Sequence, residues 1–138
     1  MTTAEYTKPL PRPQALDMPY WESLKKHELR MQKCCDCGHI WFPPAFGCPK
    51  CLSTNYEWAR LSGKGKVWSW SIFHQIYYKS FAPDIPYNVI QVRLEEGPIM
   101  ISNMVECRNE DLECDMPVEI VFDDVTEAVT LPKFKPIR

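Results

Sequence analysis

The sequence predicts a mainly β protein that combines a short N-terminal helix, a four-cysteine ribbon and a small five-stranded barrel. Two Cys-x2-Cys pairs stand ten residues apart between Cys34 and Cys51. The chain after them contains five segments of strand character separated by turn signals. Thirteen prolines against five glycines favour extended arms and loops over a helical bundle.

Length and composition limit the classes of protein to which this chain can belong. The 138 residues, of which 45% are hydrophobic and 25% charged, are ordinary for a globular chain with a real core. The N-terminus lacks the apolar stretch of a signal peptide. The longest uncharged run of strand character, residues 67–78, is shorter than the roughly 20 apolar residues of a membrane span. We therefore expect a cytoplasmic protein with no membrane segment, whose seven cysteines stay reduced.

Residues 1–29 predict a proline-rich arm followed by one helix. Four prolines in the first 19 residues favour extended backbone. Pro19 is suited to a first helical turn, and the apolar spacing continues the helix to Leu29. We expect this helix to dock on the rest of the molecule through Trp21 and Leu24.

Residues 30–60 contain the one specific motif of the sequence, a predicted zinc ribbon. Its expected ligands are Cys34, Cys37, Cys48 and Cys51. Two such pairs can hold four thiolates tetrahedrally around Zn²⁺, and Gly38 suits the tight turn after the first pair. An iron ion bound as in rubredoxin is the alternative. Four thiolates leave no open coordination position, so we expect the ion to stabilise the fold.

Two neighbouring side chains are not expected to be ligands. Cys35 would leave a gap of one residue to Cys37, which does not form the turn that the motif needs. His39 lies just past the turn and could replace a ligand, but we expect it to be exposed or to lie outside the ligand set.

Residues 61–138 predict the barrel. In Val67–Tyr78 the even positions carry Trp68, Trp70 and His74 among other large residues, which predicts a half-buried strand with that face inward. The other expected strands are residues 87–95, 99–106, 118–122 and 128–134. The long acidic break after the third strand, residues 109–116, matches a barrel of the OB type, and an SH3-like barrel is the alternative.

The residues form no catalytic constellation. Cys107 and Cys114 stand among acidic residues without a nearby histidine, which does not favour a reactive thiolate. His74 is expected to be a satisfied, buried histidine on the inner face of its strand. Nucleotide-binding and hydrolase motifs are absent from the sequence.

Charge is distributed unevenly along the chain. Residues 31–80 carry six basic and two acidic residues, whereas residues 81–138 carry five basic and twelve acidic ones. A cationic middle could meet a phosphate. The acidic second half weighs against wrapping a nucleic acid, where basic surface dominates affinity.

Several short motifs follow one another in a recognisable order. They are Tyr20-Trp21, the four-cysteine ribbon with Trp41-Phe42-Pro43-Pro44, Gly63-Lys64-Gly65-Lys66-Val67-Trp68-Ser69, Phe81-Ala82-Pro83-Asp84-Ile85-Pro86-Tyr87, Leu94-Glu95-Glu96-Gly97-Pro98, Val121-Phe122-Asp123-Asp124-Val125 and Thr130-Leu131-Pro132-Lys133-Phe134. Over about residues 19–136 this pattern resembles the DUF35 family, which joins a rubredoxin-like zinc ribbon to an OB-fold domain.

The resemblance implies a non-catalytic subunit in a hetero-oligomer with a thiolase-like catalytic partner. It implies that the OB domain bridges catalytic subunits and helps to bind acyl-CoA, while the nucleophilic cysteine and the histidine-lined site of a thiolase belong to the partner. No nucleic acid or membrane is expected as a partner.

On this reading, five residues are candidates for contacts with acyl-CoA. They are Lys64, Lys66, Lys79, Phe81 and Tyr87. The lysines could bind phosphates by charge-assisted hydrogen bonds, and the aromatic rings could pack on the adenine or the acyl chain. The alternative functions are an OB-fold module for single-stranded nucleic acid, with stacking aromatic residues, and an iron-containing electron carrier.

Overall fold

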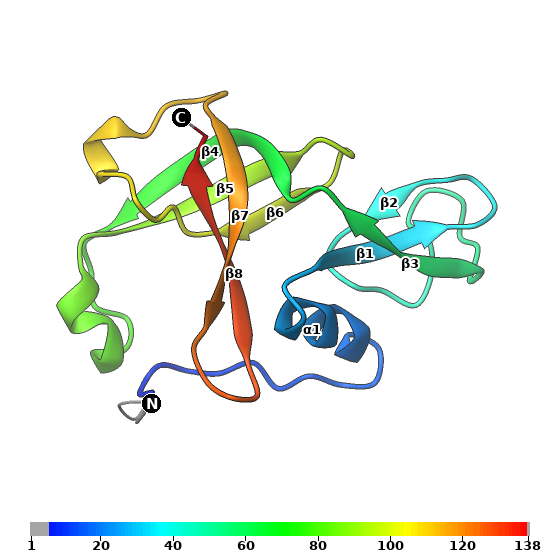
Figure 1. Cartoon of the computed structure of the whole chain (residues 1–138), viewed down its shortest axis with the longest axis horizontal. Coiled ribbons are helices and arrows are strands. Elements are labelled where there is room, and N and C mark those ends of the chain that lie inside the picture. Colours follow the sequence, from blue (N-terminus) through cyan, green and yellow to red (C-terminus); the bar gives the residue numbers. More distant parts are fainter. Residues whose placement is uncertain (1–5, 138) are drawn as a thin grey trace.

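The structure, a computed structural model, describes residues 6–137 and shows a ribbon and a barrel with one helix between them (Figure 1). The first five residues of the predicted arm lie outside the described residues. The elements are α1 (Met18–Lys25), β1 (Leu29–Cys34), β2 (Ile40–Trp41), β3 (Tyr56–Leu61), β4 (Lys64–Phe73), the 3-10 helix η1 (Lys79–Asp84), β5 (Tyr87–Leu94), β6 (Ile99–Ser102), the 3-10 helix η2 (Asn109–Asp111), β7 (Pro117–Asp124) and β8 (Thr130–Pro136).

The ribbon is a three-stranded antiparallel sheet in the order β2-β1-β3. Its central strand β1 begins at Leu29, which the helical spacing had placed in the helix. That prediction was wrong because α1 ends at Lys25 and a tight turn follows, in which His27 has a left-handed φ of 58°. Leu29 at the start of β1 pairs with Leu61 at the end of β3, so this inner end of the ribbon lies next to the barrel.

The barrel is a five-stranded curled sheet in the order β6-β5-β4-β7-β8. All neighbouring strands are antiparallel, and a parallel bridge between Met104, which follows β6, and Phe134 of β8 brings the two edges together. This is the partly open Greek-key arrangement expected for an OB-type barrel. The five predicted strands are all present, with their long break after the third, although β6 ends earlier than expected.

Strand β4 corrects the prediction for residues 67–78 in both extent and face. It spans Lys64–Phe73, and the residues after Phe73 leave the sheet. Val67 is fully buried while Trp68 is 48% exposed, so the predicted inner face lies outward at this point. A bulge between Val67 and Ser69 shifts the alternation. His74, expected to be buried on the inner face, is exposed beyond the end of the strand.

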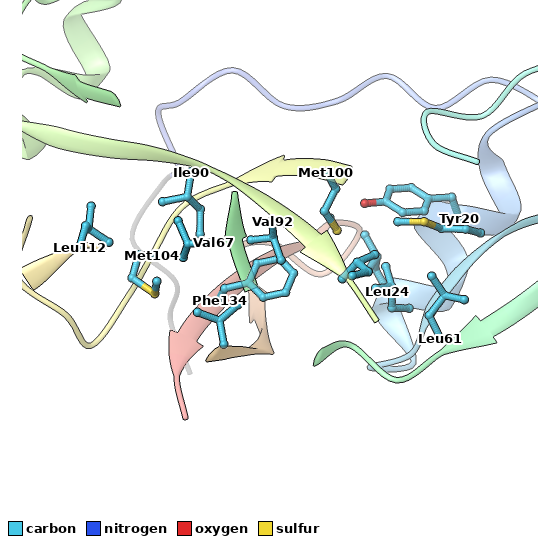
Figure 2. Packing of buried hydrophobic residues seen from close by; sticks show 14 residues of the cluster. Tyr20, Leu24, Leu61, Val67, Ile90, Val92, Met100, Met104, Leu112 and Phe134 are labelled. Atoms are coloured by element: carbon cyan, nitrogen blue, oxygen red, sulfur yellow. The ribbon is translucent and has the colours of Figure 1, made fainter. Parts of the chain in front are cut away.

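One hydrophobic core connects the helix, the base of the ribbon and the barrel interior (Figure 2). Leu24 of α1 is fully buried, as predicted, and Tyr20 rather than Trp21 is its deeply buried neighbour. Leu29 and Met31 of β1 and Phe134 of β8 belong to the same cluster. Burying a large apolar side chain contributes roughly 1.5–3 kcal/mol, so this shared cluster is what holds the ribbon against the barrel.

Candidate functional site

The four predicted cysteines come together at the outer end of the ribbon. Cys34 ends β1, Cys37 lies in the turn after it, and Cys48 and Cys51 lie in a second turn. Their four sulfur atoms lie within 4.8 Å of one another, with 3.5 Å between Cys34 and Cys51 and 3.6 Å between Cys37 and Cys48. Tetrahedral Zn²⁺ with Zn–S bonds of about 2.3 Å needs sulfur separations of roughly 3.8 Å. The cluster therefore fits a zinc ion.

The two cysteine turns have the same local geometry. The backbone N–H groups of Asp36 and Cys37 donate to Cys34 Sγ, each over 3.4 Å. In the second turn the N–H groups of Lys50 and Cys51 donate to Cys48 Sγ over 3.4 and 3.5 Å. Gly38 has the left-handed φ of 80° that the sequence indicates. Leu52 occupies the equivalent position with φ of 66°, which the sequence does not signal.

These N–H groups favour the thiolate form at the first cysteine of each turn. The hydrogen bond from the N–H of Cys37 lowers the pKa of the Cys34 thiol to about 6. At Cys48 burial raises the pKa, but the N–H groups of Cys51 and Lys50 help to lower it overall. At Cys51 the N–H of Ser53 lowers the pKa, yet the neighbouring thiols and burial raise it to about 12. A bound cation is what allows all four sulfurs to be thiolates together.

A small separate core supports this cluster. It consists of Cys34, Cys48 and Trp41, with Ala45 and Tyr56 packed against them. The amide of Gln32 donates to the carbonyl of Ala45 and accepts from its N–H, each over 2.8 Å, which ties the loop between the two turns to β1. Cys35 is exposed and lies outside the sulfur cluster, and the His39 ring stacks on Trp41 at 6.3 Å.

Four of the five candidate residues for acyl-CoA are divided between two hollows at opposite ends of β4. Lys64 and Lys66 line one hollow of about 410 Å³, which we call the basic hollow. Trp68 and Arg93 also line it. Arg93 was not among the predicted residues, because it becomes a neighbour of Lys66 only through the pairing of β4 with β5. Lys79 lines neither of the two hollows.

Phe81 and Tyr87 line the other hollow, of about 430 Å³, which we call the aromatic hollow. Its other aromatic lining residues are Phe73, Tyr77 and Tyr78. Phe73 and Tyr87 are stacked with 5.2 Å between ring centroids, and Phe81 lies 5.5 Å from Tyr87. The N-terminal arm reaches this region, where Lys8 forms an ion pair with Asp84 over 2.5 Å. Figure 1 shows the arm running beneath the barrel toward η1.

The histidines and the remaining cysteines do not assemble a nucleophile with a base in residues 6–137. His27 lies 3.0 Å from Asp124 and stacks on Phe122, a pair that the sequence gives no reason to expect. Cys107 packs against the main core, and Cys114 is exposed. Over the part of the chain that the structure describes, there is no helix with the length and apolar character needed to cross a membrane.

Comparison with known proteins supports the division into ribbon and barrel. The family model of the ChsH2 rubredoxin-like zinc ribbon domain matches residues 21–57, and that of the ChsH2 C-terminal OB-fold domain matches residues 58–123. Together they cover most of the chain and include all four clustered cysteines. The OB-fold match decides between the two barrel types that the strand count allowed.

Relatives and a solved structure give the same assignment. A DUF35 domain-containing scaffold protein of Methanocaldococcus jannaschii is 38% identical over 86% of this chain and 89% of its own length. A probable enoyl-CoA hydratase alpha subunit of Thermomonospora curvata is 32% identical over 87% of this chain but only 37% of its own length. The structure of the Ltp2-ChsH2(DUF35) aldolase contains a chain that is 29% identical, with a TM-score of 0.83 over 92% of this chain and 98% of that chain. This chain therefore belongs to the DUF35 family, with a ChsH2-type zinc ribbon followed by an OB-fold domain.

Proposed function

We propose that this protein is a non-catalytic, zinc-containing subunit of a thiolase-type complex that acts on acyl-CoA. In this complex it bridges the catalytic subunits and helps to bind the thioester. The observation that carries the proposal is the match over nearly the whole of both chains to the DUF35 chain of the Ltp2-ChsH2 aldolase. The enoyl-CoA hydratase alpha subunit among the relatives also links this fold to a CoA thioester enzyme that is named as a subunit.

The chemistry of the cysteine cluster supports a structural role for the metal. Four thiolates complete the tetrahedral shell of Zn²⁺, so no coordination position remains for a substrate. We propose Cys34, Cys37, Cys48 and Cys51 as the ligands of one zinc ion. Bound zinc would stabilise a ribbon that has only a very small core of its own.

The surface of the barrel supports the bridging role. The segment between β4 and η1 exposes Ile76, Tyr77 and Tyr78, with Tyr77 62% exposed, and β6 exposes Ile101 to 64%. Aromatic residues of this kind are enriched in protein interfaces. Such side chains on a protein of this size are suited to burial against another subunit.

The proposal is tested by co-expressing the tagged chain with a thiolase-type protein of the same genome. We expect the two to co-purify as one species whose mass exceeds that of either chain. We also expect thiolysis or transfer of acyl groups to be strongly reduced in the partner alone and restored when this chain is added. Full activity of the partner without this chain, or turnover of a thioester by this chain alone, would contradict the proposal.

A further inference from the structure

A third hollow, of about 340 Å³, lies where the barrel closes, and we call it the seam hollow. At this seam the residues after β6 meet β8, because Phe134 donates a backbone hydrogen bond to Asn103 and accepts one from Val105. The N-terminal arm, the end of η1 and the start of β5 complete the walls. The charged and amide side chains of the lining are Lys8, Asp84, Asn88, Asn103, Asn109 and Lys133, and none of them lines the basic hollow.

Three asparagine side chains fix the shape of the seam hollow. Asn88, which is 8% exposed, donates to the carbonyl of Met104 and to the side chain of Asn109, and it accepts from the N–H of Met104. Asn103 donates to the carbonyl of Asn88. Asn109 donates to the carbonyl of Pro86. The hollow is therefore preformed, since its amide groups are tied to the main chain of three neighbouring segments.

The hydrogen-bonding capacity that remains in the seam hollow is mainly that of donors. The oxygens of all three amides already accept a hydrogen bond, the one on Asn103 from Lys133 Nζ over 3.2 Å. An amide carries two N–H donors and an ammonium group three. Asn103, Asn109 and Lys133 each use one of them, so each keeps an N–H without a partner in residues 6–137. A ligand group that only accepts hydrogen bonds, such as a carboxylate, is complementary to this set.

The seam hollow also contains one cation without a carboxylate partner. Lys8 forms an ion pair with Asp84, so these two charges offset each other. Lys133 takes part in no ion pair within 4 Å among residues 6–137, and Asp123 and Asp84 act on it only from a distance. Burial lowers the pKa of Lys133, because the charged form has lost part of its hydration. A singly charged anion bound beside Lys133 would offset this loss.

An aromatic wall adjoins this cation. Phe81, Tyr87 and Asn103 line both the seam hollow and the aromatic hollow, so the two hollows share a wall. The rings of Phe81 and Tyr87 lie 5.5 Å apart between centroids. An aromatic ring or a short apolar chain can pack on them while its carboxylate reaches Lys133. Each hollow has the volume of a small-molecule site, which is roughly 300–1,000 Å³.

We propose that the seam hollow is a binding site for a free carboxylic acid with an aromatic or short apolar body. The carboxylate accepts hydrogen bonds from Lys133 and from the remaining N–H groups of Asn103 and Asn109. The apolar body packs on Phe81 and Tyr87. The acyl end of a CoA thioester has no carboxylate, so this site distinguishes the free acid from its thioester. The site depends on residues of this chain alone and not on the function proposed above.

The test is calorimetric titration of the zinc-loaded full chain with 3-phenylpropionate, its neutral amide and propionate. We expect 3-phenylpropionate to bind to one site per chain. The amide should bind about tenfold more weakly, because it lacks the charge-assisted hydrogen bonds of the carboxylate. Propionate should also bind more weakly, because it has no ring to pack on Phe81 and Tyr87. These comparisons use the wild-type chain and do not depend on the folding of a variant. Saturating coenzyme A should leave the affinity for 3-phenylpropionate unchanged.

A variant and a matched control locate the site. Lys133→Met keeps an apolar stem but removes the charge, and it should weaken 3-phenylpropionate about tenfold. Lys135→Met removes a cation two residues further along β8 that lines neither the seam hollow nor the aromatic hollow, and it should leave the affinity unchanged. The acid should raise the melting temperature of the wild type and of Lys135→Met, but not that of Lys133→Met.

Several results would overturn the inference. These are equal affinity for the acid and its amide, an affinity unaffected by Lys133→Met, an equal loss in Lys135→Met, competition by coenzyme A, or no saturable binding at millimolar acid. Tighter binding of a peptide that ends in phenylalanine would also overturn it, since the occupant would then be a protein terminus. Co-purification with a catalytic partner needs no free acid, so the proposed function can stand where this inference fails.

Discussion

At the scale of single residues, Asp124 links the end of α1 to the barrel. Its carboxylate lies 3.0 Å from Nε2 of His27, in the turn that follows the helix. It also accepts a hydrogen bond from the Thr130 hydroxyl at the start of β8. The His27 ring stacks on Phe122, two residues earlier on β7, with 5.0 Å between centroids. The left-handed turn at His27 is thus held by contacts with a distant hairpin.

This arrangement predicts a pH-dependent contribution to stability. The Thr130 hydroxyl, followed by His27, lowers the pKa of Asp124 below its ordinary value. A carboxyl with a lowered pKa in the folded state stabilises the fold above its unfolded pKa of about 3.9 and loses this effect as the pH falls through the lowered pKa. Asp124→Asn should therefore reduce the free energy of unfolding in urea at pH 7, and the difference from the wild type should shrink progressively as the pH falls below about 3.9.

The matched control is Glu127→Gln in the same hairpin, which should match the wild type across the whole pH range. A destabilisation by Asp124→Asn that stays constant down to pH 3 would show that the carboxylate charge is not the cause.

At the scale of elements, the ribbon contains both cysteines that belong to the sulfur cluster and a cysteine that does not. Replacing one of each kind therefore tests which cysteines bind the metal ion. Cys48→Ser removes a sulfur from the cluster, while Cys35→Ser removes an exposed thiol one position away from Cys34. We expect Cys48→Ser to abolish stoichiometric zinc, and Cys35→Ser to keep one ion per chain. Structural zinc in finger peptides contributes about 10–16 kcal/mol, so Cys48→Ser should also lower the melting temperature markedly.

Metal content by mass spectrometry and melting by circular dichroism check this prediction. Equal zinc loading of the two variants would contradict the ligand set. Iron in place of zinc in the pure protein would contradict the choice of metal but would leave the ligand set intact.

The ribbon and the barrel strands also show which features of the structure could be predicted from the sequence and which could not. The cysteine turns were predictable because a Cys-x2-Cys turn is a local geometry, which Gly38 also signals. The inner face of β4 was not, because Gly65 and Val67 rather than Trp68 lie on the buried face and a bulge between Val67 and Ser69 then shifts the alternation. The pairs Lys66–Arg93 and His27–Asp124 were not predictable either, since strand pairing and packing bring together residues far apart in the sequence.

At the scale of the whole molecule, ribbon and barrel share one core. Phe134 of β8 is fully buried in the same cluster as Leu29 and Met31 of β1. Strand β1 continues directly to Cys34 in the sulfur cluster. Loss of the barrel would therefore expose the base of the strand that carries this cysteine. The ribbon and the barrel should accordingly unfold as one cooperative unit.

Phe134→Ala tests this continuity from the barrel side. Removing a fully buried phenylalanine costs about 3–5 kcal/mol, which for a chain of this size lowers the melting temperature by roughly 10–17 °C. Because the core is shared, zinc release, followed with a chromophoric chelator during heating, should shift down by the same amount. Ile101→Ala, which truncates a side chain that is 64% exposed on β6, should shift neither transition. A zinc-release midpoint that stays at the wild-type temperature while the barrel melts earlier would show that the ribbon folds independently, with the shared cluster acting only as a docking contact.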